Sequence, residues 1–174
     1  MRLFIAFGVS EKAKEELKRL QAGLGSGADL KPVRDFHLTL KFLGDVDEKN
    51  INSIKEKLRS VRFNAFDAEL CGAGVFPSES HIRVVWAGVE PKDTISRLQQ
   101  EIDSALERMF PKEKRFRPHI TLARVRSVRD KSAFMDRIRS LSPKKVSFRV
   151  EKFELIKSTL TGEGPVYETI EEFP

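Results

Sequence analysis

The sequence predicts an α+β fold made of two related halves around a central cleft. The chain of 174 residues is long enough for one core, or for two small lobes that share one. Strand-like segments with a period of two alternate with helix-like segments along its length. Two near-identical strings, HLTL from His37 and HITL from His119, lie 82 positions apart, close to half of the chain. We therefore expect one domain over residues 1–174, with repeat halves of about 1–89 and 90–174 related by a pseudo-two-fold axis.

The first half begins with a strand and a helix. The apolar residues of RLFIAFGV suit a strand, and the next helix has Ser10 as its N-cap and Ala13, Leu17 and Leu20 on one face. Glycines from Gly23 onward end this helix. The remaining elements of this half are predicted as the strand FHLTLKFLGDV, the helix DEKNINSIKEKLRSV, and strands over residues 66–71 and 82–89.

The second half repeats this order after Pro91. Its elements are predicted as a helix with Ile95, Leu98, Ile102, Leu106 and Met109 facing inward, the strand HITLARV, a helix over residues 130–141, and the strands KKVSFRVEKFELIK and PVYETIEEF joined at TGEG. Phe66 with Glu69 is matched, at the same offset of 82, by Phe148 with Glu151. Chance similarity among common residue types is the alternative. The order of elements and the two histidine frames favour an internal duplication.

The composition is that of a mildly basic protein with little cysteine. Lys and Arg outnumber Asp and Glu by 32 to 26, which favours a polyanionic partner, although Lys/Glu-rich surfaces with few Cys and Met are also typical of thermophile proteins. The single cysteine, Cys71, excludes an internal disulfide and suits a reducing cytoplasm; we expect it to be a small buried residue rather than a reactive thiol. The apolar run from Leu3 to Val9 is too short to span a membrane and no cleavage site follows it. We expect a cytoplasmic monomer without a targeting segment.

Each His-x-Thr frame places an imidazole beside a hydroxyl. In a strand, residues two apart share a face, so His37 lies beside Thr39 and His119 beside Thr121, while the residues between them face the core. Across a pseudo-two-fold axis, the two pairs would face one another. One imidazole can then accept a proton while the other donates one, and the hydroxyls can bind nonbridging phosphate oxygens. This arrangement suits in-line displacement at phosphorus.

Cations near the frames would stabilise charge on those oxygens. Lys41 follows Thr39 by two residues and should share its face. Arg124 is turned away from His119 by strict alternation unless a bulge re-aims it. Lys112 and Lys114, in contrast, are interpreted as solvated rim charges.

Structural, metal-binding and serine-hydrolase roles for the histidines are less well supported. A lone histidine is usually a core or capping residue, but two in identical frames argue for function. A zinc site is disfavoured because each strand offers one good ligand and no carboxylate accompanies it, and because the third histidine, His81, lies in a loop-like segment. A serine hydrolase would need a G-x-S-x-G nucleophile elbow, which the sequence lacks.

The residues also carry a family likeness. HLTLKFLGDV and HITLAR, with RLFIAF and GVFPSESHIRVVWAGV, resemble the 2H phosphoesterase superfamily, and within it the RNA 2',3'-cyclic phosphodiesterases, also called 2'-5' RNA ligases. The resemblance covers nearly the whole chain. It implies a bilobal fold in which two antiparallel sheets line a central cleft with helices outside. It also implies hydrolysis of an RNA terminal 2',3'-cyclic phosphate to a 2'-phosphate, with neither metal nor cofactor.

The resemblance also assigns roles by position. His37 matches the general acid and His119 the general base, while Thr39 and Thr121 match residues that hold phosphate oxygens. Arg124 matches an arginine that contacts the phosphate.

Several alternatives stay open. Ligation of tRNA halves, the reverse chemistry, and an RNA-end-binding module without catalysis are the other two functions, and a small cyclic nucleotide or an ADP-ribose cyclic phosphate are other substrates. The aromatic residues Phe36, Phe42, Phe76 and Trp86 are candidates to stack on a terminal base, although a core position is favoured for Phe42 and Trp86.

Overall fold

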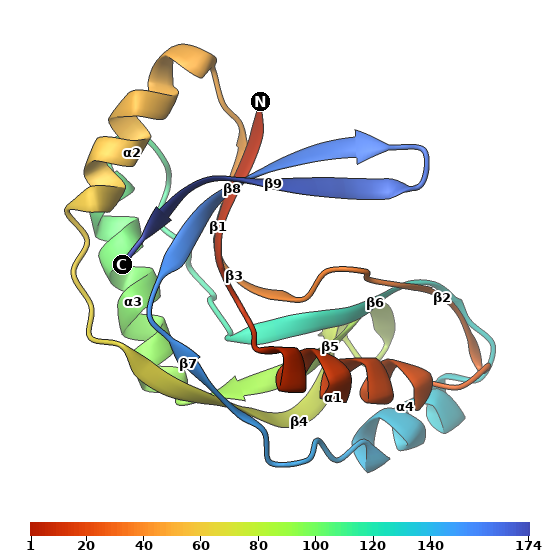
Figure 1. The fold of residues 1–174 in the computed structure, drawn as a ribbon. Helices are drawn as coiled ribbons and strands as arrows, with labels where there is room; N and C mark the ends of the chain where they lie inside the picture. The colour runs from red at the N-terminus through yellow and green to blue at the C-terminus, as the bar shows by residue number, and fades with distance from the viewer.

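The computed structural model describes residues 1–174 and contains nine strands, four α-helices and one 3-10 turn (Figure 1). The strands are β1 (Arg2–Gly8), β2 (Ala28–Pro32), β3 (His37–Asp45), β4 (Phe66–Ser78), β5 (His81–Glu90), β6 (His119–Val128), β7 (Ser147–Val150), β8 (Phe153–Thr161) and β9 (Gly164–Phe173). The helices are α1 (Glu11–Ala22), α2 (Ile51–Arg59), α3 (Lys92–Leu106) and α4 (Lys131–Ser140), with the 3-10 turn at Glu48–Asn50.

All strand pairs are antiparallel and form one curled sheet in the order β7-β4-β5-β6-β3-β1-β8-β9, with β2 added beside β6. The five strands on the β6 side, β2 included, and the four on the β3 side meet at these two histidine strands, which pair only through Leu38 and Ile120. The predicted α+β fold with antiparallel sheets and outer helices is therefore confirmed. The two expected sheets are joined at this single point.

The helices cover the outside of the curled sheet (Figure 1). Helices α1 and α4 pack against β6 and β4, while α2 and α3 pack on each other and against β9, β3 and β5. Ser10 caps α1 as predicted, since its side chain accepts a hydrogen bond of 3.2 Å from the Ala13 N–H. One large apolar cluster joins these helices to the sheet. No helix is both long and apolar enough to cross a membrane.

The structure differs from the predicted elements in four places. Strand β2 was not expected, because its five residues show no alternation and end in Pro32. Strand β4 continues past Cys71 through a bulge at Gly72, where φ is +56°. The predicted strand from residue 144 to 157 is broken after Val150, because β7 pairs with β4 while β8 crosses to pair with β1. Helix α3 ends at Leu106, so Met109 packs against the core from the following turn.

Candidate active site

The pairing of β3 with β6 brings both His-x-Thr frames together. Around the Leu38–Ile120 pair, antiparallel geometry sets His37 across from Thr121 and Thr39 across from His119. All four side chains line one cleft of about 590 Å³, a volume typical of small-ligand sites. The structure thus unites the four residues that the two motifs predicted.

A matching bulge follows each frame. The register between β5 and β6 skips Leu122, and the register between β1 and β3 skips Leu40 in the same way. Each bulge reverses the alternation of the residues beyond it. In β6 the bulge turns Arg124 toward the cleft. Arg124 was expected to share the face of His119 only if a bulge re-aimed it, and this bulge does so. At the same place in β3 stands Phe42, which is 73% exposed and also lines the cleft.

The prediction that Lys41 shares the face of His37 and Thr39 is wrong. The bulge at Leu40 turns Lys41 into the core, where 6% of the residue is exposed. Its Nζ pairs with the Asp103 carboxylate on α3 and donates a hydrogen bond of 2.7 Å to the carbonyl oxygen of Pro111. Lys41 therefore fixes α3 under the histidine strand and is not a phosphate ligand.

The buried Asp103 carboxylate is fully engaged. Burial acts to raise its pKa, but hydrogen bonds from Lys41, the Glu113 N–H and Gln99 outweigh this and hold the pKa below its ordinary value. The lysine and its carboxylate are thus a structural ion pair.

His119 is oriented by a backbone carbonyl. Its Nδ1 lies 2.7 Å from the Arg117 carbonyl oxygen, and since a carbonyl can only accept, Nδ1 carries the proton. The lone pair of the neutral ring is then on Nε2. Burial lowers the pKa of His119, and the Arg117 hydrogen bond offsets part of that shift. This is the state that a general base needs.

Two aromatic residues enclose each imidazole. His119 contacts Phe76 edge-on, with ring centroids 4.8 Å apart, and Trp86 at 6.3 Å. The ring centroid of His37 lies 5.0 Å from that of Phe4 and 5.3 Å from that of Tyr167. Burial lowers the pKa of His37 to about 4, while the charge of Asp35 acts in the opposite direction and that of His119 adds to the lowering.

The four aromatic residues considered for base stacking divide between core and cleft differently from the prediction. Phe36 is buried in the core and cannot stack on a base, whereas Phe42 is open to the cleft, so the core interpretation of Phe42 is wrong. Trp86 packs on Gly74, where an added Cβ would come within 2.3 Å of the indole, and its ring centroid lies 5.1 Å from that of Phe76 with the ring planes tilted by 34°. Of the four, Phe42 is the one that lines the central cleft.

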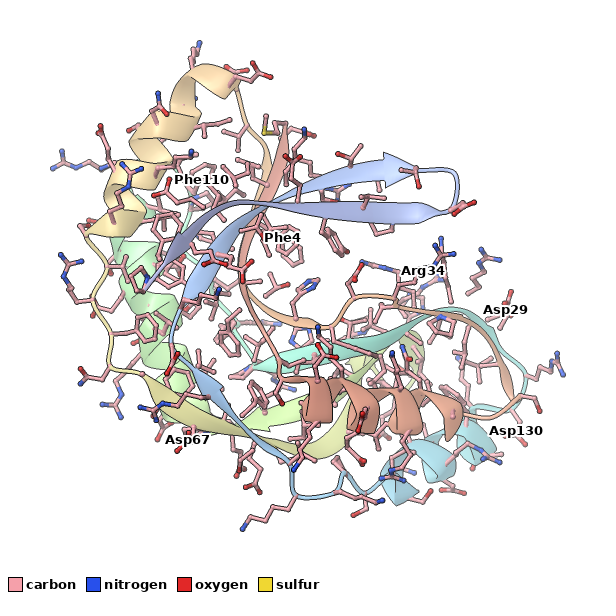
Figure 2. The ribbon with its side chains drawn as sticks, in the orientation of Figure 1. Phe4, Asp29, Arg34, Asp67, Phe110 and Asp130 are labelled. Carbon is pink, nitrogen blue, oxygen red and sulfur yellow. The ribbon has the colours of Figure 1, made fainter.

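The second wall of the cleft was not predicted from the sequence. Phe4 comes from β1, and Tyr167 from the β8–β9 hairpin, whose end (residues 158–167) extends beyond the last β8 residue paired with β1. Figure 1 shows this hairpin projecting over β6 and β2, and Figure 2 shows Phe4 below it. The offset of 82 pairs Phe4 with Trp86, which is the one signal for this wall in the sequence.

The donor set of the cleft favours proton transfer and anion binding. Two imidazoles, two threonine hydroxyls and the guanidinium group of Arg124 are among the groups that line it. No group of three or more His, Cys, Asp or Glu side chains is placed to hold a metal ion. A curled antiparallel sheet with two facing His-x-Thr strands is the arrangement that defines the 2H phosphoesterases.

Comparison with known proteins agrees with this class. The chain belongs to the 2'-5' RNA ligase superfamily, whose family model matches residues 9–162. Relatives from Methanothermobacter thermautotrophicus and Thermotoga maritima, both named RNA 2',3'-cyclic phosphodiesterase, are each 37% identical. The alignments cover 99% of this chain, with 98% of the first relative and 94% of the second.

Solved structures confirm the fold. The crystal structure of TT0787 from Thermus thermophilus has a TM-score of 0.80 at 30% identity, covering 99% of this chain and 97% of that one. LigT of E. coli, complexed with 3'-AMP, has a TM-score of 0.78 at 24% identity, with coverages of 99% and 96%.

Proposed function

We propose that the protein hydrolyses the 2',3'-cyclic phosphate at the end of an RNA to a 2'-phosphomonoester. The observation that carries this proposal is the convergence of two His-x-Thr frames and Arg124 on one cleft. The relatives named RNA 2',3'-cyclic phosphodiesterase support the choice of substrate.

His119 is the general base of the proposed reaction. Its Nε2 takes a proton from water, because Nδ1 is held by the Arg117 carbonyl. The water oxygen bonds to phosphorus as the bond from phosphorus to the 3'-oxygen breaks. His37 gives its proton to that oxygen, which leaves a 3'-hydroxyl and a 2'-phosphate.

His37 must be protonated to act as the acid, although burial makes it neutral in the free protein at neutral pH. A phosphodiester in the cleft places a negative charge beside the ring, and an opposite charge at this range raises the pKa of an imidazole. Asp35 acts in the same direction. Substrate binding thus favours the uptake, from solvent, of the proton that the acid needs.

The hydroxyls of Thr39 and Thr121 donate to the nonbridging oxygens in this scheme, and Arg124 neutralises the charge that grows on them. We propose that these groups hold the ring so that water lies in line with the 3'-oxygen. The scheme needs neither metal nor cofactor. We expect a monomer that acts on RNA ends, including tRNA fragments, in the cytoplasm.

Ligation is the second candidate, since the same histidines with exchanged roles would let a 5'-hydroxyl of another RNA attack the cyclic phosphate and form a 2'-5' bond. Water is far more abundant than RNA ends, so we expect hydrolysis to dominate.

One experiment separates these functions. An oligonucleotide with a 2',3'-cyclic phosphate is incubated with the protein in excess EDTA, with and without a 5'-hydroxyl RNA, and the products are identified. We expect a 2'-phosphate. A 3'-phosphate would show that the leaving group is assigned backwards. A 2'-5' joined product would favour the ligase. If no product forms, RNA-end binding without catalysis is the function that remains.

The two histidines should also act as a unit. His37→Ala and His119→Ala should each lower turnover by about a hundredfold or more. The turnover of the double variant should be little lower than that of the less active single variant. Near-normal turnover in either single variant would contradict the mechanism, provided that both variants are folded by circular dichroism.

A further inference from the structure

The active-site cleft continues into a second groove. We call this groove the side arm; it is lined by residues from β2, the β2–β3 loop, β6 and the hairpin end: Lys31, Arg34, Asp35, Arg124, Glu163 and Tyr167. Lys31, Asp35, Arg124 and Tyr167 also line the cleft that holds the histidines. A ligand in the cleft can therefore extend directly into the side arm.

Two cations stand next to each other at the junction. Lys31 on β2 pairs directly with Arg124 on β6, so their side chains share one face of the sheet. Like charges in this position repel, and neither forms an ion pair with a carboxylate. An anion bound between them would relieve the repulsion.

Lys31 also reaches the opposite wall. A Cβ added to Gly164, the first residue of β9 in the hairpin end, would lie 3.8 Å from the Lys31 Nζ. The ammonium group is thus held between β2 and the hairpin, on the far side of Arg124 from β5. Lys31 therefore lies where the cleft that holds the histidines continues into the side arm.

A third cation in the side arm has a weak partner. Arg34 lies below the hairpin end in Figure 2, and its nearest guanidinium nitrogen is 3.7 Å from a Glu163 carboxylate oxygen, with side chains that are 76% and 86% exposed. An ion pair this exposed contributes little to stability. A phosphate group can displace the carboxylate at small cost.

We propose that the side arm binds the phosphodiester immediately 5' of the terminal nucleotide, through Lys31 and Arg34. The inference rests on the proposed function. In a nucleotide with a 2',3'-cyclic phosphate, the 2'- and 3'-oxygens are both bonded to the cyclic phosphorus. The rest of the RNA chain is therefore attached only through the 5'-oxygen of this nucleotide. The cationic groove that opens from the cleft receives that side. The protein therefore prefers RNA ends to cyclic mononucleotides, and Glu163 competes with the RNA for Arg34.

The test compares three substrates, two of which differ only in the charge of one linkage. They are 2',3'-cyclic AMP, the dinucleotide ApA ending in a 2',3'-cyclic phosphate, and the same dinucleotide with a neutral methylphosphonate linkage. The dinucleotide should have a kcat/KM about tenfold above that of the other two, the scale of one charge-assisted hydrogen bond. Lys31→Ala and Arg34→Ala should each reduce this preference severalfold, while Glu163→Gln should increase it. Lys12→Ala, which removes an exposed cation from α1, serves as the matched control.

Equal kcat/KM for the phosphodiester and the methylphosphonate would overturn the side arm while leaving the proposed hydrolysis intact. The same holds if Lys31→Ala slows all three substrates alike. If no substrate is turned over, the proposed function fails separately, and binding of the two dinucleotides ending in a 2'-phosphate is then measured by calorimetry. If the methylphosphonate binds more weakly than the phosphodiester, and this difference disappears in Lys31→Ala, the side arm is still supported. Equal binding of the two dinucleotides to the wild type would refute it.

Discussion

The burial of His37 should make the stability of the protein depend on pH. Its pKa is lowered from 6.5 to about 4, mainly because burial penalises the charged ring. The unfolded chain takes up this proton near pH 6.5 and the folded chain only near pH 4, so the unfolded state binds more protons in between. The free energy of unfolding therefore falls as the pH is lowered through this window. At about 1.4 kcal/mol per pH unit, the loss from His37 alone is about 3 kcal/mol.

The assay is urea unfolding of the wild type and His37→Gln at about pH 7 and about pH 4. Other groups also titrate in this range, but they are present in both proteins and cancel in the comparison. The wild type should lose about 3 kcal/mol more than the variant. The exposed His81, replaced by Gln, controls for the loss of a histidine elsewhere.

An NMR titration of the His37 ring checks the same reasoning directly. The ring should titrate near pH 4 in the free protein and at higher pH when inorganic phosphate is bound. Titration near pH 6.5 in the free protein, together with equal pH dependence of the two proteins, would refute the argument from burial. A pKa that phosphate leaves unchanged would remove His37 as the acid.

Three further predictions concern the neighbouring strands. Lys41→Met should lower the free energy of unfolding by about 3 kcal/mol or more in urea melts, because it leaves the Asp103 carboxylate buried and unpaired; a change below about 1 kcal/mol would contradict a structural role. Thr39→Val and Thr121→Val should each reduce kcat on a cyclic-phosphate dinucleotide by about tenfold to a hundredfold, the scale of one lost transition-state donor, and unchanged kcat would show that these hydroxyls do not bind the phosphate. Phe42→Ala should raise KM by about tenfold through the loss of base stacking, with kcat little changed, whereas a lower kcat with the same KM would argue against stacking.

Much of the fold and the centre of the site could be predicted from periodicity. The His-x-Thr frames determine which residues share a face, and the structure places all four side chains in one cleft. What periodicity could not supply is the bulge after each frame. Strict alternation predicts Lys41 in the cleft and Arg124 outside it, and the bulges reverse both. A bulge is a property of strand pairing, and nothing in the local residue pattern indicates it.

The positions of Tyr167, in the second wall, and of Lys31, opposite it, could not be predicted for a different reason. Tyr167 and Lys31 are close to the histidines because a hairpin near the end of the chain and a short strand near its start border the same cleft. These are tertiary contacts between distant segments. The predicted boundary between repeat halves at about residue 90 stays a prediction, and β8 and β9 from the second half lie beside β1 from the first.

The bulges also bear on the direction in which a ligand can lie. Two like frames around the Leu38–Ile120 pair, if flanked by like residues, would accept a phosphodiester equally well in either of two opposed orientations. Half of the binding events would then set the wrong oxygen against the acid. The residues exposed beyond the two bulges differ, because β6 presents the charged Arg124 where β3 presents the aromatic Phe42. In the proposed reaction this difference would favour one of the two orientations, so we expect exchange of these two residues to change the ratio of 2'-phosphate to 3'-phosphate in the product.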